Sequence, residues 1–206
     1  MGDSGGWSEQ GDELPYDQVL AGRAKELNSF ATFKVKIDIL PEDVPAHAKV
    51  IPARFLYRIK GSGVKARIVV QQVRRSAKMT WLEVFAASPT TTANRVLLWH
   101  AMRKGWRVAQ GNVSAAFLHT PLPPDMCIVI IPPEEVFVGY YWLLLKAVYG
   151  LRKAPQLFQE WFVAQLGTLQ MERGLADPQL LYRALDEAML TIHADDVWLT
   201  ADDDSL

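Results

Sequence analysis

Two alternating apolar stretches flank a pair of acids near the end of the chain, and this pattern constrains the fold more than any other. Residues 189–194 and 197–200 alternate in the way that half-buried β-strands do. Only Asp195 and Asp196 separate them, so we expect a β-hairpin whose tight turn presents both carboxylates. Adjacent carboxylates repel each other and are costly to desolvate, and a hard cation such as Mg²⁺ relieves both effects. A solvated turn explains the same two residues, because Asp is common in turns.

The rest of the chain is predicted to mix hairpin strands with a few helices. Strands are expected over residues 32–38, 50–60, 64–73, 106–113, 140–145 and 180–183, and in the apolar run that begins at Cys127. Helices are expected over residues 17–30, 90–104, 115–118 and 154–173, with Asp17 as a cap and with Gly105 and Gly174 as stops. The order predicts an α+β fold, with an antiparallel sheet and helices packed on one face.

Composition fits a single domain that carries a short appendage. Half of the 206 residues are apolar, which is enough for one substantial core. Residues 1–16 are rich in Gly and acids without periodicity, so we predict that they are disordered and that the domain spans residues 17–206. The single cysteine, Cys127, excludes a disulfide framework. We find no secretory signal and no apolar run of membrane length, so we expect an intracellular protein, cytoplasmic or nuclear, without a membrane partner.

Charge is distributed unevenly, although the net charge is only −1. Residues 49–78 contain nine Lys or Arg and no acid, whereas the last twelve residues contain five Asp and no base. This asymmetry fits the handling of nucleic acid or nucleotides around a metal site. A solvated strand face beside an acidic chain end explains it equally well.

Four segments together carry a resemblance to a known family. They are KARIV at residues 65–69, NVSAAFL at 112–118, KAVYGLRKAP at 146–155 and HADD at 193–196, and EVFAASP at 83–89 supports them. In this order and spacing, the chain from about residue 21 to residue 200 resembles the reverse transcriptase (RNA-directed DNA polymerase) of copia-type LTR retrotransposons. Each motif alone is weak, but four in the same order are specific.

The resemblance implies a right-hand polymerase, with fingers over about residues 30–90, palm over most of residues 91–206, and the thumb missing. Such enzymes join a primer 3′-hydroxyl to a deoxynucleoside triphosphate on an RNA or DNA template. Two Mg²⁺ (or Mn²⁺) ions, held by three palm carboxylates, stabilise the attacking and leaving oxygens. Asp195 and Asp196 match two of these carboxylates, and the first falls on Asn112.

Asn112 is the main departure from the family pattern. Its neutral amide lacks the anionic oxygen that hard cations select. The loss of one negative charge a few ångströms from two dications costs on the order of several kcal/mol. No Asp or Glu lies between Glu83 and Asp125 to replace it. We therefore expect little or no polymerase activity.

The resemblance assigns further roles residue by residue. It implies that Lys65 and Arg67 bind the triphosphate, Phe117 screens out a ribose 2′-hydroxyl, Tyr149 and Gly150 line the base pocket, and Arg152, Lys153 and His193 lie near template or primer. Each residue also has a plainer interpretation, as a solvated charge, a turn residue or a core side chain.

Three hypotheses about the chain remain open. It is a polymerase domain that acts within a larger product, a non-catalytic nucleic-acid-binding remnant of such an element, or an unrelated α+β binding module. The sequence ends within ten residues of the paired acids, so we expect a truncated domain. Neither template preference nor oligomeric state follows from the sequence.

Overall fold

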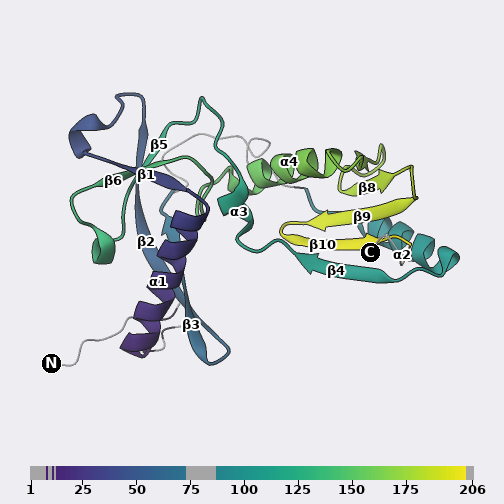
Figure 1. Cartoon of the computed structure of the whole chain (residues 1–206), viewed down its shortest axis with the longest axis horizontal. Helices are drawn as coiled ribbons and strands as arrows, with labels where there is room; N and C mark the ends of the chain where they lie inside the picture. The colour runs from purple at the N-terminus through teal and green to yellow at the C-terminus, as the bar shows by residue number, and fades with distance from the viewer. Residues whose placement is uncertain (1–7, 9–10, 12, 73–86, 203–206) are drawn as a thin grey trace. The chain divides into compact units, whose positions relative to one another are not determined.

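The computed structural model describes residues 8, 11, 13–72 and 87–202, and these residues form two compact units (Figure 1). Unit 1 combines Met1–Met79 with Phe117–Ala154, and unit 2 combines Thr80–Ala116 with Pro155–Leu206. Each unit is therefore built from two segments of the chain. The predicted α+β class is confirmed, but the described residues form two five-stranded sheets, one in each unit, rather than one sheet.

Unit 1 contains a mixed sheet beside a long helix. The strand order is β1 (Lys36–Ile39), β6 (Tyr141–Leu144), β5 (Ile128–Ile131), β2 (Lys49–Lys60) and β3 (Gly63–Val70). Short helices η1 (Pro41–Asp43), α3 (Ala116–His119) and η3 (Glu134–Val136) lie in the connections. Strands β2 and β5 are parallel, so the predicted antiparallel pairing does not extend to this pair of unit 1. Parallel neighbours need a long crossover, and local sequence patterns indicate only hairpins.

The β2–β3 hairpin is confirmed where it was predicted. Its two-residue turn places Gly61 at φ +60°, a conformation that glycine adopts without steric cost. The side chains on one face of the hairpin are apolar and buried, and they include Phe55, Tyr57, Ala66 and Ile68. The opposite face carries exposed cations, so the hairpin has the alternation of a half-buried antiparallel pair.

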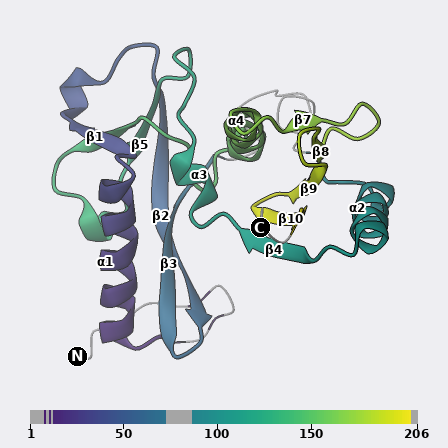
Figure 2. The same cartoon turned by 45° about the vertical axis from the view of Figure 1, so that its right-hand side comes forward.

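Helix α1 (Tyr16–Thr32) lies along this hairpin and covers the edge of β3 (Figure 2). Gly22 makes the close approach possible, because a Cβ there would come within 2.7 Å of the Val64 carbonyl oxygen. One turn later, the Glu26 Oε1 accepts a hydrogen bond of 3.1 Å from the amide of Ile68. The helix thus satisfies an amide that an edge strand would leave exposed.

The start of the chain differs in detail from the prediction. Asp17 lies inside the first turn of α1 rather than at its cap, and Pro15 occupies the cap position without a side-chain hydrogen bond. The helix continues to Thr32, so the strand predicted over 32–38 begins only at Lys36. Leu14 is buried, whereas most of residues 1–12 lie outside the described residues, and their disorder stays a prediction.

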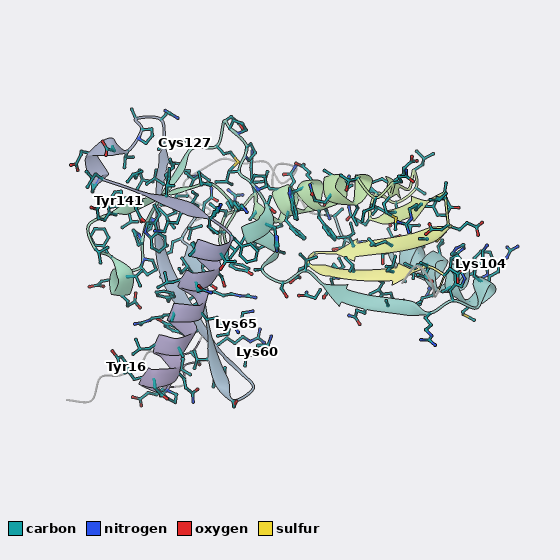
Figure 3. The ribbon with its side chains drawn as sticks, in the orientation of Figure 1. Tyr16, Lys60, Lys65, Lys104, Cys127 and Tyr141 are labelled. Atoms are coloured by element: carbon teal, nitrogen blue, oxygen red, sulfur yellow. The ribbon has the colours of Figure 1, made fainter. Side chains whose placement is uncertain are left out.

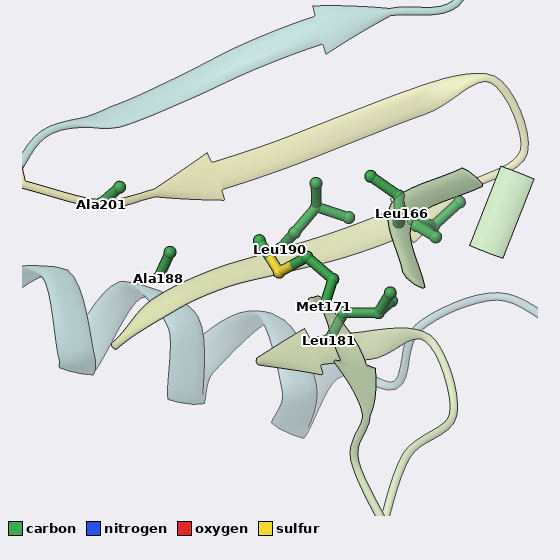
Figure 4. Close-up of a cluster of buried hydrophobic side chains, with 7 residues drawn as sticks. Leu166, Met171, Leu181, Ala188, Leu190 and Ala201 are labelled. Atoms are coloured by element: carbon green, nitrogen blue, oxygen red, sulfur yellow. The ribbon is translucent and has the colours of Figure 1, made fainter. Parts of the chain in front are cut away.

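Unit 2 contains an antiparallel sheet in the order β4 (Val108–Asn112), β10 (Asp196–Thr200), β9 (Ala188–His193), β8 (Leu180–Arg183) and β7 (Glu172–Arg173). Helix α2 (Thr91–Lys104) packs against β9 and β10. A cluster of buried side chains joins the end of α4 (Ala154–Gly167) to the sheet (Figure 4), and it includes Leu166, Met171, Leu181 and Leu190. This core holds the β9–β10 hairpin in place.

The ends of the two long helices in unit 2 illustrate what local sequence can predict. The predicted α2 is confirmed: the Thr90 hydroxyl accepts a 3.1 Å hydrogen bond from the amide of Ala93, and Gly105 ends the helix at φ +71°. Helix α4 ends at Gly167 rather than at the predicted Gly174, because β8 pairs with residues 172–173.

In the described part of the chain, no helix is long and apolar enough to cross a membrane.

A buried polar network ties the start of α2 to the loop before β8. Asp177 accepts hydrogen bonds from the amide and hydroxyl of Thr90, at 2.9 and 2.8 Å, and from the amide of Gln179 at 2.9 Å. Burial by itself would raise the pKa of Asp177, but these three hydrogen bonds outweigh it and hold the pKa below its ordinary value. The network fixes two segments that are far apart in sequence.

Candidate functional site

The paired acids lie at the end of the β9–β10 hairpin, as the sequence predicts. His193 pairs with Asp196 in the sheet register, so Ala194 and Asp195 form the turn, one residue earlier than the predicted pair Asp195 and Asp196. Ala194 has φ +55°, a left-handed conformation that costs a residue with a Cβ about 1–2 kcal/mol. Both carboxylates are exposed. Backbone strain of this kind is common at functional sites, because there the geometry of the turn matters more than its stability.

Asn112 lies beside these acids at the end of the neighbouring strand. It pairs with Asp196 in the β4–β10 register, and its Nδ2 donates a 3.1 Å hydrogen bond to the Asp196 Oδ1. The amide of Val113 donates to the carbonyl oxygen of Asp195 at 2.8 Å. The structure thus brings Asn112 beside the two acids, which lie 83 and 84 positions further along the chain.

These residues do not fit a site for two divalent cations. In the described ranges, no group of three or more His, Cys, Asp or Glu side chains is placed to hold a metal ion. The group that lies beside Asp196 on the neighbouring strand is the amide nitrogen of Asn112, which carries no negative charge. Two carboxylates and a neutral amide leave two dications short of anionic oxygen.

Lys65 and Arg67 belong to a second group of predicted site residues, in unit 1. Both are exposed on β3 and line one cavity of about 500 Å³ together with Arg58 and Lys60 of β2. Figure 3 shows Lys60 and Lys65 on this hairpin. Partial burial, and then the like charges of Arg67 and Lys60, lower the pKa of Lys65. The nearby carboxylate of Glu26 opposes this lowering, so it offsets part of the positive charge on this face.

An aromatic pair adjoins the cationic hairpin. The rings of Phe117 and Tyr149 meet edge to face, with centroids 5.1 Å apart, and both side chains are half-buried. The guanidinium carbon of Arg67 lies 4.5 Å from the centroid of the Tyr149 ring, which is a cation–π contact. Lys65, Arg67, Phe117 and Tyr149 thus form a connected set inside unit 1.

Gly150 has a structural role in this set. Its φ is +88°, and a Cβ there would lie 2.1 Å from the carbonyl oxygen of Val70. The Val70 amide donates to the Tyr149 carbonyl oxygen at 2.9 Å, so this turn packs backbone to backbone against β3. Only glycine fits such a turn, and its predicted place in a base pocket stays a prediction.

The remaining predicted residues lie at element boundaries. Arg152 and Lys153 immediately precede α4, and the amide of Arg152 donates a 2.7 Å hydrogen bond to the side chain of Gln72. His193 ends β9 and is exposed. Part of the 83–89 motif, three cations of the basic run (Arg74, Arg75 and Lys78) and two acids of the chain end (Asp203 and Asp204) lie outside the described residues.

The sequence motifs do not single out Arg58 and Lys60, which belong to the basic run over residues 49–78. The strand register supplies the missing signal. Because Lys60 pairs with Gly63, Arg58 pairs with Lys65, and residues paired in an antiparallel sheet share a face. Counting outward from the predicted Gly61 turn would have placed all four cations on one side of the hairpin.

Comparison with known proteins identifies the family. The sequence model for "Reverse transcriptase (RNA-dependent DNA polymerase)" matches residues 39–206. The chain is 25% identical to the retrovirus-related Pol polyproteins from transposons RE1 and RE2 of Arabidopsis thaliana, over 82% and 81% of its length. It is 24% identical, over 80% of its length, to the corresponding polyprotein from transposon TNT 1-94 of Nicotiana tabacum.

The chain spans only 12–13% of the length of these polyproteins, so it matches one region of each. The family match covers unit 2 and the part of unit 1 from residue 39 onward, and it includes all the predicted site residues. This chain therefore belongs to the reverse transcriptase family, as a domain of the type found in copia-type retrotransposons.

Proposed function

We propose that this domain keeps the nucleotide- and nucleic-acid-binding surface of a reverse transcriptase but does not extend primers. The observation that supports this proposal is the Asn112 amide, which lies 3.1 Å from the Asp196 carboxylate in place of a third anionic ligand. The intact part of the site is the basic hairpin of unit 1, with its adjoining aromatic pair. The basic hairpin predicts that nucleotide and nucleic-acid binding is retained, whereas the site at Asn112 predicts that primer extension is lost.

Divalent metal ions are the general cofactors of this family, and when bound they stabilise charge on the attacking and leaving oxygens. The residues of this chain do not fit a two-ion site, so we derive no catalytic step through one. What Asp195 and Asp196 retain is a pair of exposed carboxylates, and the neutral amide of Asn112 donates a hydrogen bond to one of them. We propose that any ion held there binds weakly.

We propose that the cations of unit 1 bind the nucleotide. Lys65 and Arg67 share a strand face, and we propose that they contact the triphosphate of an incoming nucleotide. Tyr149 contacts Arg67, and Phe117 contacts Tyr149. We propose that these two rings contact the sugar or base of the nucleotide. Arg152, Lys153 and His193 remain candidates for contacts with template or primer. We assign unit 2 a palm-type role and the β2–β3 hairpin a fingers-type role.

Primer extension tests the proposal. We expect no incorporation of deoxynucleotides on an RNA or DNA template with Mg²⁺ or Mn²⁺, while the protein still binds primer-template with a strong dependence on salt. Clear incorporation by the unaltered chain would overturn the proposal and favour a polymerase domain that acts within a larger product. An absence of salt-sensitive binding would favour an unrelated binding role.

The Asn112→Asp variant tests whether restoring an acid at this position restores primer extension. It restores the third carboxylate without altering the backbone pairing of β4 with β10. Asn28→Asp is the control, because it adds the same charge at an exposed position on α1. Activity that appears with Asn112→Asp and not with Asn28→Asp would attribute the loss to position 112. The predicted intracellular location, cytoplasmic or nuclear, is a separate matter and remains a prediction.

A further inference from the structure

Strand β1 forms one edge of the unit 1 sheet, with β6 as its single neighbour among the described strands. The carbonyl oxygen of Val35, just before β1, accepts a 2.8 Å hydrogen bond from the amide of Leu145, just after β6. Backbone groups alternate in direction along an antiparallel strand, so Ile37 directs its N–H and C=O toward β6, whereas Lys36 and Asp38 direct theirs outward. Such an outward row is a template for a further strand.

The sequence of β1 is complementary to itself about Ile37. When two β1 strands pair antiparallel about this residue, Lys36 of each copy lies opposite Asp38 of the other. Each of these pairs can exchange two backbone hydrogen bonds through the outward groups, and opposite charges directly across from each other add stability. A register shifted by two residues would instead set lysine against lysine or aspartate against aspartate. The charges that commonly protect a short edge strand therefore favour one register here.

The side chains on both faces of β1 suit this pairing. Lys36 forms an ion pair with Asp38 of its own chain, and its Nζ lies 4.6 Å from the centroid of the Trp142 ring. Two copies would therefore join two lysines and two aspartates in a group of alternating sign. On the opposite face, Ile37 is 47% exposed, and a second Ile37 would cover it at the two-fold axis.

We propose that β1 pairs with β1 of a second copy of this chain, in a two-fold symmetric dimer whose two unit 1 sheets are continuous. A second copy is the partner that supplies complementary charge at both ends of the three-residue seam formed by Lys36, Ile37 and Asp38. The pairing is isologous, so it is complete at two copies. The seam contains none of the proposed nucleotide-binding residues, so it is independent of the proposed function.

Analytical ultracentrifugation of the full chain, up to about 500 µM, tests the proposal, because so small a seam belongs to the weak end of protein interfaces. We expect a reversible equilibrium between monomer and dimer. Lys36→Asp should weaken the dimer by about tenfold or more, because four carboxylates then meet at the seam. Adding Asp38→Lys to this variant should restore the dimer, since opposite charges face each other again.

Lys25→Asp is the control for general charge, because it makes the same change at an exposed position on α1, and it should leave the dimer unchanged. Thermal melts would show which variants are folded. A chain that stays monomeric, or one that assembles beyond a dimer, would overturn the proposal. A folded double variant that does not recover the dimer would also overturn it.

Disulfide trapping tests the register, in a Cys127→Ala background that removes the single natural cysteine. Ile37→Cys should give a disulfide-linked dimer under mild oxidation, because residues paired on the axis have Cα atoms about 4.5 Å apart. Ile39→Cys is the matched control on the same strand and face, and its two copies would lie more than about 13 Å apart. Equal trapping at the two positions, or none at position 37, would contradict the proposed pairing.

Discussion

Replacing Asn112 by Asp should destabilise the metal-free domain and make its stability depend on divalent ions. The Asn112 Nδ2 lies 3.1 Å from the Asp196 Oδ1, so the variant sets two carboxylates at that separation and removes a hydrogen bond. Both positions are exposed, so a dielectric constant near that of water applies. The repulsion is then about 1 kcal/mol, and the lost hydrogen bond adds about 0.5–1.5 kcal/mol.

The expected result is a fall of roughly 2 kcal/mol in the free energy of unfolding of unit 2 in EDTA. Mn²⁺ should reverse this fall, because an ion that binds only the folded state at ten times its dissociation constant adds about 1.4 kcal/mol. Urea titrations in EDTA and in Mn²⁺, followed by the fluorescence of Trp198 in β10, would measure both effects. The other tryptophans must be replaced by Phe to make this signal specific.

The unaltered chain and the Asn28→Asp variant are the controls. Neither should lose stability through this repulsion, and Mn²⁺ should leave both almost unchanged. The reasoning is refuted if Asn112→Asp is as stable as the parent in EDTA, or if Mn²⁺ stabilises all three proteins equally. In either case, the amide at position 112 would not be what prevents the acids from holding metal.

Four further predictions concern stability. Ala194→Gly should stabilise the β9–β10 hairpin by about 1 kcal/mol in urea titrations, because glycine adopts φ +55° freely; a loss of stability would contradict strain at this turn. Gly150→Ala should cost about 3 kcal/mol or more, since its Cβ would overlap the Val70 carbonyl oxygen; an unchanged melting temperature would contradict the close packing. Burial raises the pKa of Glu26, so the charge of this side chain costs the fold more stability as pH rises above about 4.5. Glu26→Gln keeps the hydrogen-bond acceptor and should therefore match or exceed the stability of the parent at neutral pH. Glu26→Ala removes the acceptor and should lose about 1–3 kcal/mol. Because the pKa of Asp177 is lowered, its ionised form stabilises the fold above about pH 3.8, and this contribution is lost as pH falls. Asp177→Asn should therefore cost about 1–3 kcal/mol of unfolding free energy at neutral pH. On acidification, the variant should lose less unfolding free energy than the parent.

Much of the local structure could be predicted from the sequence, because its causes lie within a few residues. The Gly61 turn, the Thr90 cap and the Gly105 stop all depend on the conformational limits of one residue and its near neighbours. The strands of the β9–β10 hairpin follow from alternation alone. The helix end predicted at Gly174 was wrong because pairing of β7 with β8, rather than local propensity, decided it.

The candidate site was only partly predictable. Motif order suggested that Asn112 and the paired acids meet, but their hydrogen bond depends on the register of β4 against β10. The contribution of Arg58 and Lys60 likewise depends on strand pairing. The Thr90–Asp177 and Glu26–Ile68 hydrogen bonds link residues 87 and 42 positions apart, with no local signal in the sequence.

The sequence by itself determined where most of the strands and helices form, which family the motifs resemble, and that a neutral residue stands where the family motif has its first acid. Only the tertiary structure decided which distant parts of the chain meet. Examples are the Asn112 amide beside Asp196, the four cations around one cavity, and the parallel pairing of β2 with β5. The physical reason is that backbone preferences act over a few residues. Sheet register and packing instead depend on contacts between segments that the chain brings together only when it folds.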